Sequence, residues 1–246
     1  MSKINIAEIF GPTIQGEGPN VGCKCLFVRV VGCNFTCEWC DSKFAWKCSE
    51  NTLTLEPLQL AKKLKEMCDT TNTGRVILTG GNPCLYDFTE VIDYLHDNNI
   101  KVDVETQGTP LPPWLYEVDQ LVISPKAPSS KQKDVYEDVK QFLLAESLIP
   151  MNYNVTIKIP VFTQEDFEFA ERYYNLCEAF NFEGSGINIK LYLSVGNTNT
   201  EESGDISTRI LKDYENLINK VCNSNMKNVY VLPQVHTLVW GNKQGV

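Results

Sequence analysis

The sequence predicts an α/β protein, an incomplete (β/α) barrel of about six parallel strands. Short β-rich apolar runs alternate along the chain with longer stretches of helical periodicity. Several expected strands end in polar or glycine-rich clusters, as strands do at the active-site edge of such folds. Six or seven strands can be distinguished, fewer than the eight of a closed barrel, so we expect an open one.

The expected strands are short apolar runs rich in valine, isoleucine and leucine. Each is separated from the next by a stretch long enough to hold a connecting segment, usually a helix, so a parallel sheet is expected. In chain order the expected strands are Leu26–Val31, Val76–Thr79, Lys101–Glu105, Gln120–Ser124, Val155–Val161, Ile187–Val195 and Asn228–Leu232.

The expected helices lie between these strands. The first has a recognisable start, because Thr54 and Glu56 precede Pro57, and proline favours an early helical position. The chain shows no internal repeat, low-complexity tract or linker, so residues 1–246 are expected to form a single domain, with Gly196–Gly204 as a surface loop. The expected helices are Leu58–Met67, Phe88–Asn98, Val135–Leu144, Glu165–Phe180 and Ile206–Val221.

The overall charge is acidic. The 246 residues include 22 basic and 31 acidic side chains, which gives a formal net charge of −9. A sequence-independent grip on nucleic acid needs a basic surface, so we expect no nucleic-acid partner. One local basic pocket for a small anion remains compatible with this balance.

The sequence carries no recognisable export or membrane segment. Residues 1–5 do not lead from a basic start into an apolar stretch, and no apolar run approaches the ~20 residues needed to cross a bilayer. We therefore expect a cytoplasmic location and no membrane partner. In a reducing cytosol, cysteines act as thiols, metal ligands or catalytic groups.

Polar and glycine-rich clusters follow several of the expected strands. Because the carboxyl ends of parallel strands meet at one edge of a sheet, we expect these clusters to converge on one pocket. They are Gly32-Cys33, Gly80-Gly81-Asn82, Glu105-Thr106-Gln107, Ser124-Pro125-Lys126 and Pro233-Gln234-Val235-His236.

Three of the ten cysteines are closely spaced. Cys33, Cys37 and Cys40 lie within eight residues, directly after an expected strand, and such a loop can wrap its thiolates around a metal. A closed zinc site needs a fourth ligand, whereas three ligands with an open position suit a catalytic metal. The alternatives are a structural zinc loop or unrelated buried thiols.

The remaining cysteines have no comparable spacing. They are expected to pack as small apolar residues, with a second site at Cys23 and Cys25 as the alternative. These cysteines are Cys23, Cys25, Cys48, Cys68, Cys84, Cys177 and Cys222.

The Cys-x3-Cys-x2-Cys spacing of the loop 33–44 resembles that of radical S-adenosylmethionine enzymes. The resemblance implies that the three cysteines hold a [4Fe–4S] cluster whose open iron binds the amino and carboxylate groups of S-adenosylmethionine. It also implies that the reduced cluster generates a 5′-deoxyadenosyl radical, which removes a hydrogen atom from the substrate. An electron donor such as flavodoxin or ferredoxin is then an expected partner.

A second motif, Phe-Gly-Pro-Thr-Ile-Gln-Gly-Glu-Gly at residues 10–18, leads through Phe27-Val28-Arg29 to the cysteine loop. Together with Trp39-Cys40-Asp41 and the clusters above, it is similar to the 7-carboxy-7-deazaguanine synthases over nearly the whole chain. This resemblance implies ring contraction of 6-carboxy-5,6,7,8-tetrahydropterin to 7-carboxy-7-deazaguanine with loss of ammonia, for queuosine biosynthesis. It further implies a magnesium-dependent homodimer with a modified partial barrel.

Several side chains suit such a pterin. Arg29 offers a planar fork for a carboxylate, and Glu17 can accept from the amino edge of the ring. Gln15 and the peptide groups of Ile14 and Gly16 can bond ring heteroatoms. The alternative for Arg29 is a surface charge on a strand. The alternative for Gly16 is a turn position.

The segment 1–24, which carries most of these residues, is expected to bind the substrate. By resemblance, Thr79 also faces the substrate. His236 is a candidate for substrate contact or proton transfer. The resemblance also makes Ser42 a magnesium ligand in place of the usual threonine, whereas alone it would indicate a turn or a helix cap.

The expected contacts to S-adenosylmethionine come from several strand ends. By resemblance, residues 39–41 contribute through their backbone, and Gly81, Ser124 and Lys126 also contact the cofactor. A helix cap or turn is the alternative role for Glu105. The full expected set is Trp39, Cys40, Asp41, Gly81, Asn82, Glu105, Ser124, Pro125, Lys126 and Gln234.

Asn82 departs from the superfamily, in which the third position of this Gly-Gly element is usually glutamate. Asparagine lacks the charge that pairs with the ammonium of the cofactor, so we expect a weaker contact or one made by backbone. Two other activities stay open: a glycyl-radical activase acting on a large protein, and a non-catalytic metal-binding or electron-transfer protein. The motif 15–18 with Arg29 favours a small carboxylated substrate.

Overall fold

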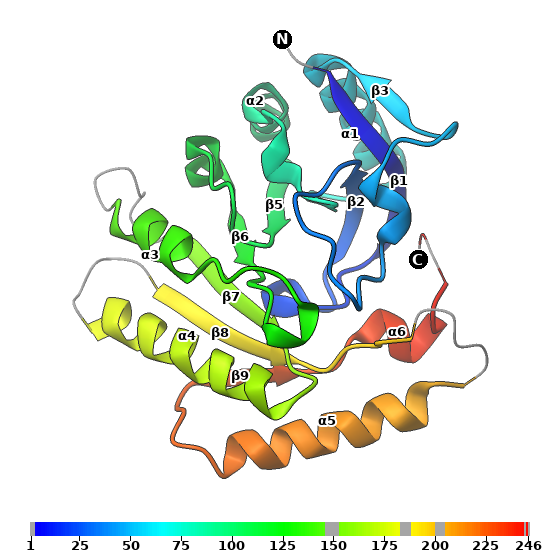
Figure 1. Cartoon of the computed structure of the whole chain (residues 1–246). Coiled ribbons are helices and arrows are strands. Elements are labelled where there is room, and N and C mark those ends of the chain that lie inside the picture. Colours follow the sequence, from blue (N-terminus) through cyan, green and yellow to red (C-terminus); the bar gives the residue numbers. More distant parts are fainter. Residues whose placement is uncertain (1–2, 146–152, 183–187, 200–204, 244, 246) are drawn as a thin grey trace.

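The computed structural model describes residues 3–145, 153–182, 188–199, 205–243 and 245. Its strands form one sheet in the order β3-β1-β2-β4-β5-β6-β7-β8-β9 (Figure 1). These strands are β1 (Ile4–Ile14), β2 (Lys24–Val30), β3 (Leu53–Leu55), β4 (Arg75–Gly80), β5 (Lys101–Thr106), β6 (Gln120–Ile123), β7 (Asn154–Pro160), β8 (Asn188–Ser194) and β9 (Val229–Leu232).

The part of the sheet from β2 to β9 is entirely parallel. Its strands β2, β4, β5, β6, β7, β8 and β9 coincide with the expected ones, although the expected start of β8 at Ile187 lies outside the described residues. The α/β class and the open, mostly parallel barrel are therefore confirmed. The parallel strands of the described chain correspond one to one to the seven expected ranges.

Strands β1 and β3 were not expected from the sequence. β1 runs antiparallel to both β2 and β3. Its register with β2 shifts between Phe10 and Thr13, where Gly11-Pro12 interrupts the ladder. A run broken by glycine and proline does not carry the strand periodicity that identified the other strands.

Helices α1 to α5 follow the outer side of the curved sheet (Figure 1). All five coincide with expected helices, whereas the short α6 was not expected. The start of α1 is a capping box formed by Glu56 and Gln59, with Pro57 as the first helical residue. The helices are α1 (Pro57–Thr71), α2 (Thr89–Asp97), α3 (Tyr136–Leu144), α4 (Gln164–Phe182), α5 (Ser207–Cys222) and α6 (Val235–Trp240).

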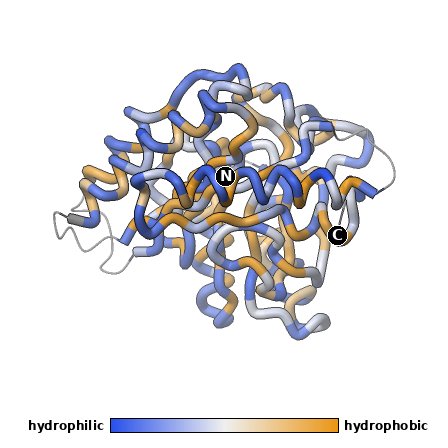
Figure 2. Tube along the Cα trace, turned by 90° about the horizontal axis from the view of Figure 1, so that it is seen from below, coloured by the Kyte–Doolittle hydropathy of each residue, from blue (hydrophilic) through white to orange (hydrophobic). Residues whose placement is uncertain are grey.

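The hydrophobic core lies between the sheet and these helices. Strand residues such as Val28, Leu78 and Ile157 are fully buried, and they pack in one cluster with helix residues such as Leu60 and Val139. Figure 2 shows the amphipathic helices as alternating hydrophilic and hydrophobic stretches. Among the described residues, no helix combines the length and apolar character that crossing a membrane requires.

The segment after β1 lies against the inner side of the sheet. It includes the short 3-10 helix η1 (Gly18–Asn20), and Asn20 Nδ2 donates to Asp103 Oδ2 of β5 at 2.7 Å. This contact holds the segment against the amino-terminal half of β5, since Asp103 also pairs with Arg75 at the start of β4. Gly196 to Asn199 of the expected surface loop follow β8, whereas residues 200–204 lie outside the described chain.

Candidate active site

A cavity of about 490 Å³ lies where the carboxyl ends of the parallel strands meet. It brings together all the residues predicted for the cluster, the substrate and magnesium, and all those predicted for S-adenosylmethionine except Asn82 and Pro125. The predicted residues that line it are Ile14, Gln15, Gly16, Glu17, Arg29, Cys33, Cys37, Trp39, Cys40, Asp41, Ser42, Thr79, Gly81, Glu105, Ser124, Lys126, Gln234 and His236.

The three closely spaced cysteines face this cavity as free thiols. Burial raises the pKa of all three thiols, that of Cys37 to about 11, against the opposing positive charge of Lys126. No group of three His, Cys, Asp or Glu side chains in the described ranges is arranged to hold one metal ion.

The loop that carries the cysteines is bonded together at its ends. Gly32 N donates to Ala45 O at 2.8 Å, and Asn82 N donates to Gly32 O at 2.7 Å. Gly81 has no room for a side chain, because a Cβ there would lie 2.0 Å from Gly32 O. The glycine pair after β4 therefore seats the start of the cysteine loop, whatever else it contacts.

Lys126 lies close to the cysteines. Its Nζ donates to Ser124 Oγ at 3.0 Å and lies 5.8 Å from the centre of the Trp39 ring. Trp39 packs at 4.9 Å against Phe162, and its Nε1 donates to Ser129 Oγ at 3.0 Å. This side of the cavity thus combines thiols, one cation and two aromatic rings.

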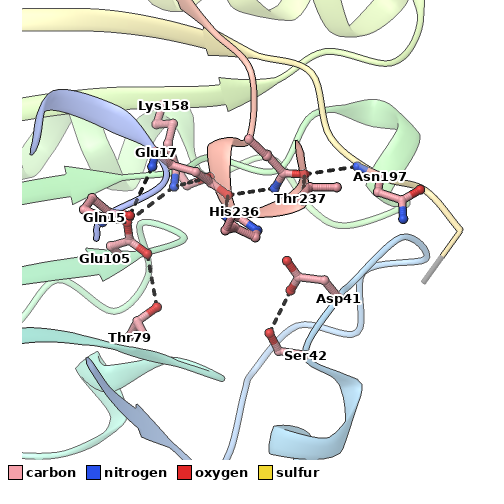
Figure 3. Close-up of polar contacts among 12 residues, drawn as sticks. Gln15, Glu17, Asp41, Ser42, Thr79, Glu105, Lys158, Asn197, His236 and Thr237 are labelled. Carbon is pink, nitrogen blue, oxygen red and sulfur yellow. Dashed lines mark hydrogen bonds and ion pairs between the residues drawn. The ribbon is translucent and has the colours of Figure 1, made fainter. Parts of the chain in front are cut away.

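Arg29 belongs to a chain of polar contacts on the side of the cavity formed by β1 and β2. Its Nε donates to Glu8 Oε1 at 2.8 Å, and its Nη1 donates to Ser42 Oγ at 2.9 Å. The Ser42 hydroxyl in turn donates to Asp41 Oδ1 at 2.7 Å (Figure 3). Arg29 is therefore half-buried and oriented into the cavity edge rather than being an isolated surface charge.

Opposite this chain, Lys158 of β7 lies between two carboxylates (Figure 3). Its Nζ is 2.6 Å from Glu17 Oε2 and 3.4 Å from Glu105 Oε1. Burial alone would raise the pKa of the Glu17 carboxyl, but Lys158, His236 and hydrogen bonds to Lys158 and Gln234 lower it to about 2. Burial would likewise lower the pKa of Lys158, but the two carboxylates hold it above its usual value.

Further polar side chains complete this group. Glu105 accepts from Gln15 Nε2 at 3.1 Å and from Thr79 Oγ1 at 3.2 Å. Gln234 Nε2 donates to Glu17 Oε1 at 2.7 Å. Glu105 and Gln234, predicted for the cofactor, thus lie in one network with the residues predicted for the substrate.

His236 reaches the same group from α6. Its Nδ1 lies 3.9 Å from Glu17 Oε1. Val235 N donates to Gly16 O at 3.0 Å, and a Cβ on Gly16 would lie 2.6 Å from His236 Nδ1. The absence of a side chain at Gly16 therefore allows α6 to close against the segment after β1.

Asn82 is fully buried outside the cavity lining. Its Oδ1 accepts from Cys84 N at 3.2 Å and Thr106 Oγ1 at 3.0 Å, and its Nδ2 donates to Asn34 Oδ1 and Thr109 O, both at 3.0 Å. Because protein partners engage both atoms of this amide, the side chain acts as a structural link here. Its predicted cofactor contact, like that of Pro125, is not reflected in the cavity lining.

Comparisons with known proteins agree with the arrangement of this site. Residues 27–168 match the model of the Radical SAM superfamily. The chain is 38% identical to 7-carboxy-7-deazaguanine synthase of Bacillus subtilis, covering 99% of this chain and 98% of that protein. The chain belongs to the 7-carboxy-7-deazaguanine synthase family. The synthase of Bacillus cereus is 36% identical, with all of both chains covered.

Solved structures agree with this family on the fold. QueE from Escherichia coli superposes with a TM-score of 0.64 at 21% identity, covering 95% of each chain. Streptococcus suis SuiB bound to precursor peptide SuiA gives a TM-score of 0.56 at 13% identity, covering 84% of this chain and 48% of that chain.

Some residues of this synthase site were not predicted from the sequence. Glu8 and Lys158 are ion-pair partners of predicted residues, while Phe162 and Asn197 line the cavity. A lysine inside the apolar run of β7 was the one available signal, since charged residues are almost never fully buried unless paired. Glu8 gave no such signal.

Proposed function

We propose that this chain catalyses the radical S-adenosylmethionine-dependent ring contraction of 6-carboxy-5,6,7,8-tetrahydropterin to 7-carboxy-7-deazaguanine, with loss of ammonia, in queuosine biosynthesis. The observation that carries the proposal is the full-length similarity to named synthases, with every predicted cluster and substrate residue on one cavity. The reaction class is that of a carbon–nitrogen lyase.

The cavity suits the cofactors of the superfamily. Cys33, Cys37 and Cys40 would hold a [4Fe–4S] cluster, and the charge of Lys126 partly offsets the rise that burial causes in the pKa of their thiols. Trp39 and Ser124 lie beside that lysine and would contact S-adenosylmethionine. When bound, this pair supplies the radical that starts the reaction.

The opposite side of the cavity suits the pterin ring. Glu17 and Glu105 are acceptors for ring N–H groups, and Gln15 and His236 offer further polar atoms beside them. The peptide groups of residues 14–16 border the same space. These side chains would orient the ring so that one face points to the cofactor side.

Arg29 would bind the pterin carboxylate. Glu8 and Ser42 already orient its guanidinium, so little side-chain freedom is lost on binding. Magnesium would lie next to this group, with the Ser42 hydroxyl as a ligand, because hard oxygen donors suit that ion. The Ser42 hydroxyl is hydrogen-bonded to both Arg29 and Asp41. Binding of substrate and metal would replace these two hydrogen bonds with contacts to the substrate and to the metal.

Further parts of the proposal go beyond the site. We place the chain in the cytoplasm as a single-domain homodimer, with residues 1–24 contributing to substrate binding and 33–44 to the cluster. Flavodoxin or ferredoxin would supply the electron. A dimer is tested by light scattering of the reconstituted protein, and the donor by replacing dithionite with either protein.

An anaerobic assay tests the activity directly. Reconstituted protein is incubated with 6-carboxytetrahydropterin, S-adenosylmethionine, magnesium and reductant, and the deazaguanine product is followed by mass spectrometry. Product formation supports the synthase. Cleavage of the cofactor without any deazaguanine favours an activase, and no cleavage at all favours a non-catalytic metal protein.

A further inference from the structure

Lys158 is a buried charged side chain on β7. Its neighbours Ile157 and Ile159 on β7 are fully buried, and Lys158 itself is 7% exposed. Removing an ammonium group from water costs several kcal/mol unless opposite charges compensate it. The compensating groups are Glu17 and Glu105, which approach it from separate elements.

Two glutamine side chains donate hydrogen bonds to these carboxylates. Gln15 Oε1 accepts from Glu17 N at 3.1 Å, which directs Gln15 Nε2 toward Glu105. Gln234 Oε1 accepts from Asn197 N at 3.1 Å, which directs Gln234 Nε2 toward Glu17. Because a backbone N–H can only donate, both amide orientations are fixed, and both carboxylates receive donated hydrogen bonds.

A proton on either oxygen of Glu17, or on Oε1 of Glu105, would remove one of these bonds. The Glu17 oxygens accept from Gln234 and Lys158, and Glu105 Oε1 accepts from Gln15 and Lys158. Two carboxylates near one another would nevertheless tend to share a proton if no cation lay between them. Lys158 is the described cation within ion-pair distance of both.

We propose that Lys158 is a positioning residue that keeps Glu17 and Glu105 ionised together, so that the cavity presents two hydrogen-bond acceptors to its substrate. The inference rests on the proposed function and concerns how the same site selects its ligand. A ring edge bearing N–H and amino groups, as in a pterin, matches two acceptors. An edge with an oxo group in place of the amino group does not.

Other titratable groups near this site do not replace the lysine. Tyr192 of β8 is in register beside Lys158, and Cys25 of β2 lies near Glu105. Burial raises the pKa of Tyr192 and raises that of Cys25 to about 12, so both stay neutral. His236 faces Glu17 alone, at 3.9 Å.

The test compares Lys158→Met with Lys158→Arg in reconstituted protein with S-adenosylmethionine bound. Binding of fluorescent 6-carboxypterin is titrated from about pH 5 to about pH 7, below the range in which the pterin ring loses its own N–H proton. Wild type and K158R should bind with little pH dependence, whereas K158M should bind up to about tenfold more weakly for each pH unit below its new carboxyl pKa. A K158M profile parallel to that of wild type would overturn the proposal.

The preference for one ligand over another gives a second readout. A merely structural role of Lys158 would not change this preference. 6-Carboxylumazine, which carries an oxo group in place of the pterin amino group, is used as the competitor. Wild type and K158R should prefer the pterin at every pH, and K158M should lose that preference at low pH. Retention of the full preference by K158M would contradict the proposal. Repeating the profiles with His236→Gln in each background separates imidazole titration from that of the carboxylates.

A double variant covers the case in which K158M does not fold. Lys158→Met with Glu105→Gln removes one charge of each sign, so the buried net charge of the site is unchanged. The double variant should fold and should lose the pH dependence. If it also fails to fold, charge compensation is not what Lys158 supplies, and the proposal is wrong.

The proposed function and this inference fail in different ways. Absence of deazaguanine product from wild type, with cluster and cofactor present, would reject the function. Product formation by wild type, together with pH-independent binding by K158M, would reject only the role of Lys158.

Discussion

Arg29 and Glu8 face each other across the antiparallel pair β1–β2 and form an ion pair of 2.8 Å between Nε and Oε1. The contact uses the guanidinium nitrogen that lysine lacks. It joins the antiparallel edge of the sheet, which the sequence did not reveal, to the residue expected to bind the substrate carboxylate.

Replacing Arg29 should therefore impair the reaction even when a positive charge is kept. Arg29→Ala should reduce kcat/KM by about 1.5–3 kcal/mol of transition-state stabilisation, the range for a hydrogen bond to a charged group. Arg29→Lys should recover little, because Glu8 can no longer hold the cation in place. Steady-state kinetics check this, with the exposed Arg172→Ala as the control; an unchanged kcat/KM for R29A would reject the carboxylate role.

Loss of any one cluster cysteine should remove the cluster. Cys33→Ala, Cys37→Ala and Cys40→Ala should each fail to reach the roughly four irons per chain of a [4Fe–4S] cluster, and should lose its brown colour and activity. Cys177→Ala is a matched control, because that cysteine is buried in α4 away from the cavity. Iron analysis after anaerobic reconstitution measures the difference, and full iron content in the three variants would contradict the assignment.

A methyl group at Gly16 should displace His236. The added Cβ would lie 2.6 Å from His236 Nδ1, so α6 must shift away from the segment after β1. Gly16→Ala should raise KM for the pterin with a smaller effect on cofactor cleavage. Gly74→Ala is the control, since no atom lies within 4 Å of a Cβ there; equal kinetic constants for the two variants would argue against this packing.

Asn82 should matter for stability. Asn82→Ala removes a side chain that links β4 with the residues after β5 and with the cysteine loop. Leaving buried polar partners unsatisfied should cost about 1–3 kcal/mol in the free energy of unfolding. Urea unfolding measures this cost, with the half-buried Asn98→Ala, which loses one bond to Tyr94 O, as the comparison. A loss no greater than that of N98A would be the contrary result.

Acid should destabilise the protein partly through Glu17. Its folded-state pKa is about 2 against an ordinary 4.5, so the unfolded chain binds this proton more readily. The stabilising contribution is complete above the unfolded value and is lost as the pH falls from about 4.5 to about 2. Urea midpoints should fall less steeply across this window in Glu17→Gln than in wild type, with the exposed Glu66→Gln as the control. Equal slopes for E17Q and wild type would contradict this role.

The repeating part of the fold could be predicted because each unit carries its own signal. Runs such as Val155–Val161 and the periodic stretch Ile206–Val221 report strand and helix locally. β1 contains Gly11-Pro12 and needs β2 and β3 as partners, so its strand character depends on contacts that are distant in the sequence. α6 is six residues long, too short for helical periodicity to show.

The site divides in a similar way. Residues of contiguous motifs, such as Cys33 and Glu17, could be predicted because their spacing is itself informative. Lys158 could not be assigned, since Glu17 lies 141 residues and Glu105 lies 53 residues away in sequence. Asn82 could be singled out as a departure, but its partners, and hence its structural role, appear only in the fold.

The hydrogen bonds at the two ends of the cysteine loop have a consequence for the enzyme when oxygen damages its cluster. Because Gly32 N is bonded to Ala45 O and Asn82 N to Gly32 O, the loop is anchored to the sheet by peptide groups and not by iron. Loss of an oxidised cluster should therefore leave the surrounding strands paired. We expect a cluster to be rebuilt on this folded scaffold, without passing through a denatured chain.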